Sequence, residues 1–173
     1  MLGYNDIAAF HFINSVLANP VFDVAMPLIT QLGSGEFIFV LAIFAILLSG
    51  SERRLSGVLL LAGLAAGYFA IDFLKANVAM PRPFMSIPDV RLLVPKASGF
   101  SFPSGHAFNV FMAATIMTKF FKKEWLWYIL AILTAFSRVY IGVHYPSDVL
   151  AGGLLGIIIG YILVKAAGES KAI

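Results

Sequence analysis

The chain has 173 residues, of which 60% are hydrophobic and 12% are charged. Soluble domains carry about 25% charged residues, so this composition indicates an integral membrane protein, and the length fits one domain. The net charge of +3 is small and the basic residues do not cluster, which excludes a nucleic-acid-binding surface. The absence of cysteine excludes disulfides, thiolate catalysis and cysteine-bound metals.

Residues 4–33 form an amphipathic segment whose relation to the membrane the sequence leaves open. Ile7, Phe10 and Ile13 recur at helical spacing, and the pair Asn19-Pro20 interrupts that pattern. A second amphipathic stretch follows the break. We expect two short helices lying in the membrane interface. The alternative is one kinked transmembrane helix, which the polar residues of the segment disfavour.

Five apolar runs follow, at about residues 34–50, 55–74, 103–120, 125–141 and 146–164. Crossing a bilayer takes about 20 helical residues, so each run is a candidate span. We expect a polar turn at residues 51–54 and an irregular loop at residues 84–100. The expected fold is therefore an all-α integral membrane bundle of five transmembrane helices, or six with the N-terminal segment 1–33. Residues 34–168 would form the core and residues 169–173 a cytoplasmic tail.

Small residues mark one face of the last run. Gly152, Gly156 and Gly160 recur every four residues, which places them in one line along a helix. Such a line lets two helix backbones approach closely in a membrane. We therefore expect this helix to pack tightly against a neighbour.

The distribution of basic residues predicts the orientation. If the spans alternate, seven basic residues fall on one side and five on the other, and three of those five belong to the motifs described below. The positive-inside rule makes the first side cytoplasmic. The first group is Arg53, Arg54, Lys119, Lys122, Lys123, Lys165 and Lys171; the second is Lys75, Arg82, Arg91, Lys96 and Arg138.

Three polar motifs share the second, extracytoplasmic side. The first runs from Lys75 to Arg82-Pro83 and contains two cations suited to phosphate oxygens, although alone it would fit an ordinary membrane interface. The second, Pro103-Ser104-Gly105-His106, opens a helix. We expect Pro103 in its first turn and the N–H groups of the next three residues free to bind an anion.

The third motif carries an arginine, a histidine and an aspartate. Arg138 precedes His144 by six residues, and Asp148 follows His144 by four, across Pro146. That spacing can return the carboxylate to the imidazole, which would fix its tautomer and leave the other ring nitrogen free to attack. A structural His–Asp pair is the alternative for this motif in isolation.

Together the motifs read K-x6-R-P, P-S-G-H and S-R-x5-H-x3-D. This pattern resembles the signature of the type 2 phosphatidic acid phosphatase family of membrane lipid phosphatases, with every fixed position present. The resemblance implies that His144 is a nucleophile oriented by Asp148, and that His106 acts as general acid and then base. It also implies a phosphate site formed by Lys75, Arg82, Ser104, Gly105 and Arg138, with no metal or other cofactor.

The resemblance implies a lipid phosphate in the bilayer as substrate, and the small size suggests bacterial envelope lipids. These are lipid A 1-phosphate, undecaprenyl pyrophosphate and phosphatidylglycerol phosphate, which the sequence does not separate. Arg91 and Lys96 in loop 84–100 are candidate headgroup-specificity residues. The expected location is the bacterial inner membrane, with the site facing outward. Alternatives are a vanadium-dependent haloperoxidase, which the membrane composition disfavours, and a non-enzymatic anion-binding scaffold or transporter.

Overall fold

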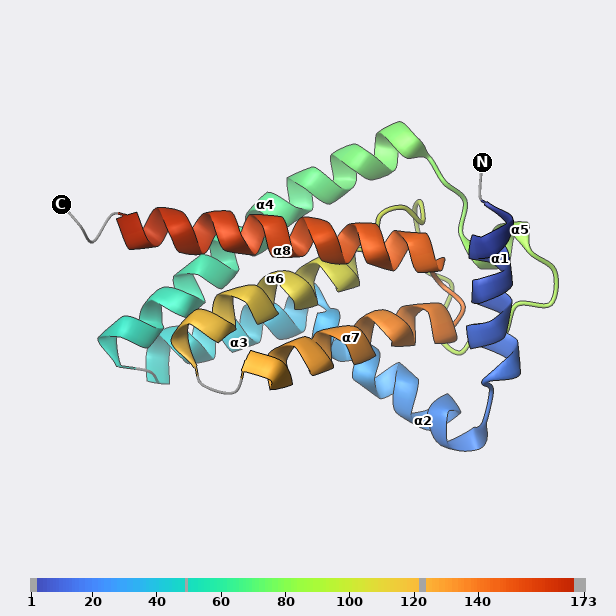
Figure 1. Ribbon diagram of the computed structural model, residues 1–173, viewed down its shortest axis with the longest axis horizontal. Coiled ribbons are helices and arrows are strands. Elements are labelled where there is room, and N and C mark those ends of the chain that lie inside the picture. Colours follow the sequence, from blue (N-terminus) through green and yellow to red (C-terminus); the bar gives the residue numbers. More distant parts are fainter. Residues whose placement is uncertain (1–2, 49, 122–123, 170–173) are drawn as a thin grey trace.

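The computed structural model describes residues 3–48, 50–121 and 124–169, and over these residues every regular element is a helix. Helices α3, α4, α6, α7 and α8 form a bundle, and the N-terminal segment crosses one end of it (Figure 1). The bounds are α1 Tyr4–His11, a π-helical turn Phe12–Val16, α2 Pro20–Ile29, a 3-10 turn Thr30–Gly33, α3 Gly35–Leu48, α4 Ser51–Val78, α5 Pro83–Ser86, α6 Gly105–Phe120, α7 Glu124–Tyr140 and α8 Pro146–Glu169.

All five apolar runs form helices, as expected, but they differ in length. Among the described residues, the stretch Arg53–Ser86 and helix Pro146–Gly168 are each long and apolar enough to cross a membrane. The N-terminal pair Tyr4–Val16 and Pro20–Gly33 meets the same criterion only as one broken span, bent by 115°. The described part of the chain is thus all-helical and that of an integral membrane protein, but the expected count of five spans is not confirmed.

Three helix boundaries differ from the expectation. Residues 51–54 are the first turn of α4 and not a separate polar turn, because Gly50 already provides the extended residue before the helix. The same helix continues past Lys75 to Val78 and ends at Ala79, whose backbone is left-handed. Helix α6 begins at Gly105, because Ser104 has an extended backbone and caps the helix with its side chain.

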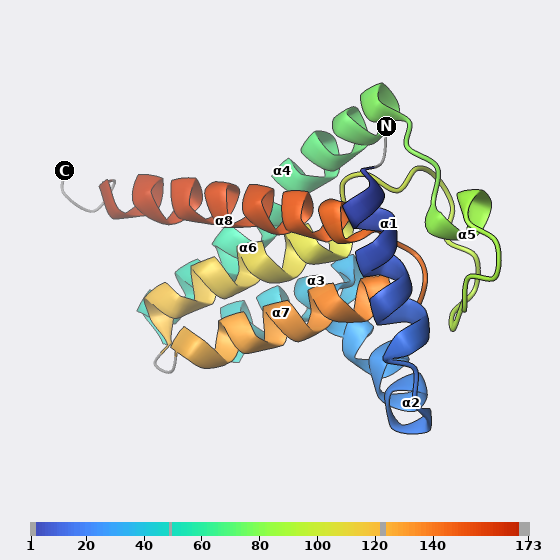
Figure 2. The same cartoon turned by 45° about the vertical axis from the view of Figure 1, so that its right-hand side comes forward.

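The N-terminal segment is broken where the sequence predicted. The side chain of Asn19 accepts a hydrogen bond from the Phe22 N–H at 2.9 Å, and Pro20 occupies the first turn of α2. Helix α1 lies across the end of the bundle at which α7 ends and α8 begins (Figure 2). The segment therefore packs on the part of the protein that carries the three motifs.

Helices α6 and α8 touch backbone to backbone along the glycine line. A Cβ atom at Gly152 would lie 2.3 Å from the carbonyl oxygen of Ser104, and one at Gly156 would lie 2.3 Å from that of Phe108. Only hydrogen fits at such distances, so the expected close packing of the last helix is confirmed. This contact holds the start of α6 against the start of α8.

The bundle has two chemically different ends. The motif end comprises residues 79–104, residues 141–145 and the first turns of α6 and α8. The basic end carries Arg53, Arg54, Lys119 and Lys165, where α4 begins and α6 and α8 end (Figure 1). Lys122, Lys123 and Lys171 lie outside the described residues. The four described basic residues assigned to the first side therefore lie at the end opposite the motifs, as the orientation argument requires.

Candidate active site

The connection from α7 to α8 places His144 beside Asp148. Gly142 has a φ of +87°, which lets the chain turn sharply after α7. Pro146 then begins α8, with Asp148 in its first turn. The Nδ1 atom of His144 lies 3.1 Å from Oδ2 of Asp148, and the two residues are 2% and 0% exposed. The predicted pair therefore forms, in a buried setting where a carboxylate can hold one tautomer of the ring.

Asp148 is held by more than the histidine. Its Oδ2 atom accepts hydrogen bonds from the Ser101 hydroxyl and, at 2.9 Å, from the Tyr145 N–H. Ser101 is fully buried and is anchored by its own N–H, which donates to the Met80 carbonyl at 2.8 Å. Sequence reasoning missed Ser101, because it stands outside the three motifs and nothing in its spacing relates it to Asp148.

The other nitrogen of His144 faces an arginine. Nε2 lies 3.3 Å from Nη1 of Arg82, whose side chain is fixed by donation to three backbone carbonyls. The carbonyls belong to Gly99, Val143 and Ser98, at 3.0, 3.0 and 2.9 Å. With Nδ1–H donating to Asp148, Nε2 accepts a hydrogen bond from Nη1 of Arg82, so a cation lies directly at this nitrogen.

Arg138 approaches from the last turn of α7. Its side chain is buried, and Nη1 donates to the Thr30 hydroxyl at 2.8 Å. The Nε atom is buried with no partner among the described residues. A buried N–H without an acceptor is costly, so this edge of the guanidinium is suited to an anion that supplies the missing acceptor.

The remaining motif residues gather around the same point. His106 stands at the second position of α6, within Coulomb range of His144, Lys75 and both motif arginines. Lys75 donates to the Phe100 carbonyl at 3.0 Å. One expected donor is different: the Ser104 N–H is not free, because it donates to the Asp148 carbonyl at 3.0 Å, and the Ser104 side chain accepts from Ala107.

The electrostatics favour a neutral His144. Burial lowers the pKa of His144 well below its ordinary value of 6.5, and the nearby charges of Arg138 and Arg82 lower it further. Both causes disfavour the imidazolium form. His144 therefore stays neutral at neutral pH, while the surrounding cations can attract an anion.

The sequence matches the PAP2 superfamily over residues 56–171. The chain belongs to this superfamily. It is 35% identical over 133 residues to an undecaprenyl-diphosphatase of Sulfolobus acidocaldarius, covering 75% of this chain and 64% of that protein. It is 33% identical over 150 residues to undecaprenyl-diphosphatase BcrC of Bacillus subtilis, covering 85% of this chain and 76% of that one.

A solved structure extends the similarity to the N-terminal segment. The crystal structure of Aquifex aeolicus LpxE aligns with a TM-score of 0.86 and 32% identity, over 94% of this chain and 96% of that one. The family resemblance of the sequence is therefore confirmed, and the PAP2 arrangement includes helices that precede the region matched by the family.

In this PAP2 protein, the two candidate specificity residues have different surroundings. Arg91 forms an ion pair with Asp23 at 2.7 Å and donates to the Asn14 carbonyl at 2.8 Å. Asn14 is fully buried, and its side-chain amide donates to the carbonyls of Arg91 and Tyr140. Arg91 therefore joins loop 84–100 to the N-terminal segment, whereas Lys96 is exposed.

A second contact attaches the N-terminal segment to α8. The carboxylate of Asp6 accepts hydrogen bonds from the Ser147 N–H at 2.9 Å and from the Ser147 hydroxyl at 2.6 Å. An anion at a helix N-terminus is favoured by the helix dipole. Asp6 therefore caps the N-terminus of α8 at Ser147, the residue before Asp148. Sequence reasoning did not predict this role.

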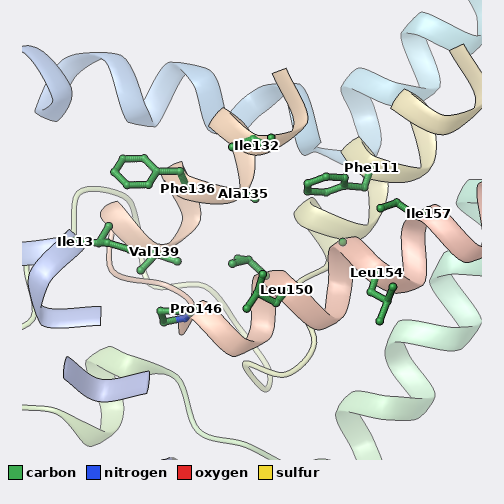
Figure 3. Close-up of a pocket in the computed structure, with 12 residues that line it drawn as sticks. Ile13, Phe111, Ile132, Ala135, Phe136, Val139, Pro146, Leu150, Leu154 and Ile157 are labelled. Atoms are coloured by element: carbon green, nitrogen blue, oxygen red, sulfur yellow. The ribbon is translucent and has the colours of Figure 1, made fainter. Parts of the chain in front are cut away.

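An apolar groove of about 450 Å³ runs between α7 and α8. Figure 3 shows Val139 and Pro146 at one end of it and Leu154 and Ile157 at the other. The side chains of the candidate site are not part of its lining, but Val139 and Val149 directly follow Arg138 and Asp148 in sequence. The groove thus begins beside the polar site and extends toward the middle of the bundle.

Proposed function

We propose that this protein is a lipid phosphatase that hydrolyses a phosphomonoester or pyrophosphate group through a phosphohistidine intermediate. The observation that carries the proposal is the buried His144–Asp148 pair, whose second ring nitrogen, Nε2, accepts a hydrogen bond from the cation Arg82. A binding protein or transporter needs cations for an anion, but it does not need an oriented and neutral imidazole among them.

In the first step, the Nε2 atom of His144 attacks the phosphorus. The bond between phosphorus and the leaving oxygen breaks, and His106 gives that oxygen a proton, so the lipid leaves as an alcohol or a monophosphate. Asp148 accepts the Nδ1–H and stabilises the charge that develops on the ring. The buried Nε of Arg138 donates to a phosphoryl oxygen, which satisfies the unpaired group.

In the second step, water replaces the histidine. His106 carries that first proton because the anionic substrate offsets the charge of the surrounding cations. Now neutral, it removes a proton from a water molecule that attacks the phosphorus of the phosphohistidine. The P–N bond breaks, inorganic phosphate leaves, and His144 returns to its starting form. The same residue thus serves as acid and then as base, as reversal of proton transfer between two half-reactions requires.

Fixed basic side chains take the place that a metal ion would have in neutralising the phosphoryl oxygens. Phosphoryl transfer mainly requires positioning and neutralisation of charge on the phosphoryl oxygens. Arg82 is held by three carbonyls and Arg138 by a hydroxyl, and Lys75 lies within Coulomb range of both. We therefore propose that turnover continues in the presence of chelators.

The substrate class is inferred from the surroundings of the site. The polar residues lie at one end of a membrane bundle, and the groove between α7 and α8 offers an apolar wall for a hydrocarbon chain. Two relatives are named undecaprenyl-diphosphatases, which supports undecaprenyl pyrophosphate among the substrates. Lipid A 1-phosphate and phosphatidylglycerol phosphate are the other candidates. We place the protein in a bacterial inner membrane with the motif end outward.

The test uses the full chain purified in detergent. We expect phosphate release from undecaprenyl pyrophosphate, phosphatidylglycerol phosphate or lipid A in the presence of EDTA, with inhibition by orthovanadate. Rapid quenching with radiolabelled substrate should trap an acid-labile, hydroxide-stable phosphoprotein. His144→Ala should lose both the phosphoprotein and turnover. Turnover by His144→Ala would overturn the nucleophile assignment, and turnover that needs a divalent ion would overturn the fixed-cation account.

A further inference from the structure

We infer that Thr30, in the N-terminal segment, is a positioning residue for the phosphate-binding arginine Arg138. This inference rests on the proposed function. The Thr30 hydroxyl accepts a hydrogen bond from Nη1 of Arg138 at 2.8 Å across 108 residues of sequence. Thr30 is 2% exposed and lies in the 3-10 turn Thr30–Gly33 that joins α2 to α3.

The two arginines of the site are held very differently. Arg82 donates to three backbone carbonyls, so its orientation is over-determined. For Arg138, the Thr30 hydroxyl is the one side-chain anchor found among the described residues, and Nε has no partner there. A long arginine side chain loses considerable conformational freedom when it is fixed. A single anchor that fixes it before the substrate arrives therefore improves binding of the phosphoryl group.

The turn that carries Thr30 is itself fixed, which the inference requires. The Gly33 carbonyl accepts a hydrogen bond from the Asn109 side chain at 3.0 Å. A Cβ atom at Gly33 would lie 2.8 Å from the His106 carbonyl and 2.9 Å from a Thr134 methyl group. The turn is therefore held between α6 and α7, the helices that carry His106 and Arg138. The threonine hydroxyl is a stationary acceptor.

The geometry also explains why the residue is a threonine in an apolar setting. Nη1 donates to Thr30, whereas Nε has no acceptor among the described residues. Without the hydroxyl, Nη1 would also be buried and unpaired, and the guanidinium would have to rotate to find another acceptor. Thr30 thus selects the orientation in which Nε remains available for a phosphoryl oxygen.

The experiment measures binding of orthovanadate to purified full-length protein by calorimetry, together with lipid phosphate turnover. Thr30→Val removes the hydroxyl with little change of shape and should weaken orthovanadate binding roughly 10-fold. Thr30→Ser restores the acceptor and should bind within about twofold of wild type. If Thr30→Val does not fold, Thr30→Ala is measured in its place, because it removes the same oxygen. Thr134→Val is the matched control: it is buried on the same helix as Arg138, and its hydroxyl donates to the Leu130 carbonyl.

A double-mutant cycle separates positioning from a general structural role. In an Arg138→Ala background, Thr30→Val should weaken orthovanadate binding no further, because the guanidinium that it positions is gone. Full additivity of the two changes, or wild-type binding by Thr30→Val, would overturn the inference. Wild-type protein that binds orthovanadate without hydrolysing any lipid phosphate would contradict the proposed function, but the cycle would still decide the role of Thr30. Absence of orthovanadate binding to wild type would overturn both.

Discussion

The two ends of the helical bundle are built on different principles. At the motif end, polar side chains cross long distances in sequence: Asn14 bonds to the Tyr140 carbonyl, Asp6 to Ser147, and Arg82 to Ser98. At the basic end, the Ser56 hydroxyl donates to the Arg53 carbonyl three residues away, and the Arg53 guanidinium lies over the Phe121 ring at 5.3 Å. The motif end has the geometric constraint that the proposed chemistry needs, whereas the basic end carries the charges on which the proposed orientation rests.

The largest difference in kcat/KM should be found between one substitution at the motif end and one at the basic end. His106→Ala removes the proposed general acid and base, and we expect kcat/KM for a lipid phosphate to fall about 1,000-fold. Arg53→Gln at the basic end should leave kcat/KM in detergent unchanged. Steady-state phosphate release measures both. Comparable losses from the two substitutions would show that the ends do not divide the work in this way.

A smaller effect should follow from a residue that sequence reasoning missed. Ser101→Ala removes one hydrogen bond to the buried carboxylate of Asp148, so we expect kcat to fall roughly 10- to 100-fold with KM nearly constant. Ser98→Ala, in the same loop, is the control, because only the Ser98 backbone carbonyl contacts Arg82. The assignment fails if the two variants have the same kcat.

Single substitutions of Arg91 and Lys96 should have different effects on stability and on substrate preference. Arg91→Ala breaks the ion pair with Asp23, so we expect a lower melting temperature and equal losses of kcat/KM for all substrates. Lys96→Ala removes an exposed cation and should lower use of a pyrophosphate several-fold more than use of a monophosphate, with an unchanged melting temperature. Parallel effects of Lys96→Ala on both substrate types would remove it from headgroup selection.

Orientation can be tested with almost no effect on activity, because the chain has no cysteine of its own. A membrane-impermeant thiol reagent applied from outside should label Ser86→Cys, whereas Ser51→Cys should react only after the cytoplasmic face is opened. Turnover of both unlabelled variants should match wild type. Labelling of both positions from one side would contradict the separation of the two ends across the membrane.

Much of the fold and of the site is local in sequence and could therefore be predicted. The apolar runs set the helices, and the four-residue spacing from His144 to Asp148 brought that pair together. The glycine line predicted the contact of α8, although it did not identify α6 as the partner. Ser101, Thr30 and Asp6 could not be found this way, because each acts through a contact distant in sequence that no periodicity encodes. The role of Ser104 as a cap also depended on a boundary that the motif alone does not set.

The glycine contact between α6 and α8 affects how the helices can respond to changes in the lipid bilayer. A bilayer changes thickness and lateral pressure with temperature and lipid composition, and helices commonly respond by tilting. Here the Ser104 carbonyl packs closely against Gly152, and the Ser104 N–H donates to the Asp148 carbonyl. Because these contacts join the starts of both helices, we expect the two helices to tilt together. We therefore expect the distance between His106 and the His144–Asp148 pair to stay nearly constant when the membrane deforms. Changing the thickness of the host bilayer should alter how readily a lipid reaches the site, while the rate of phosphoryl transfer stays constant.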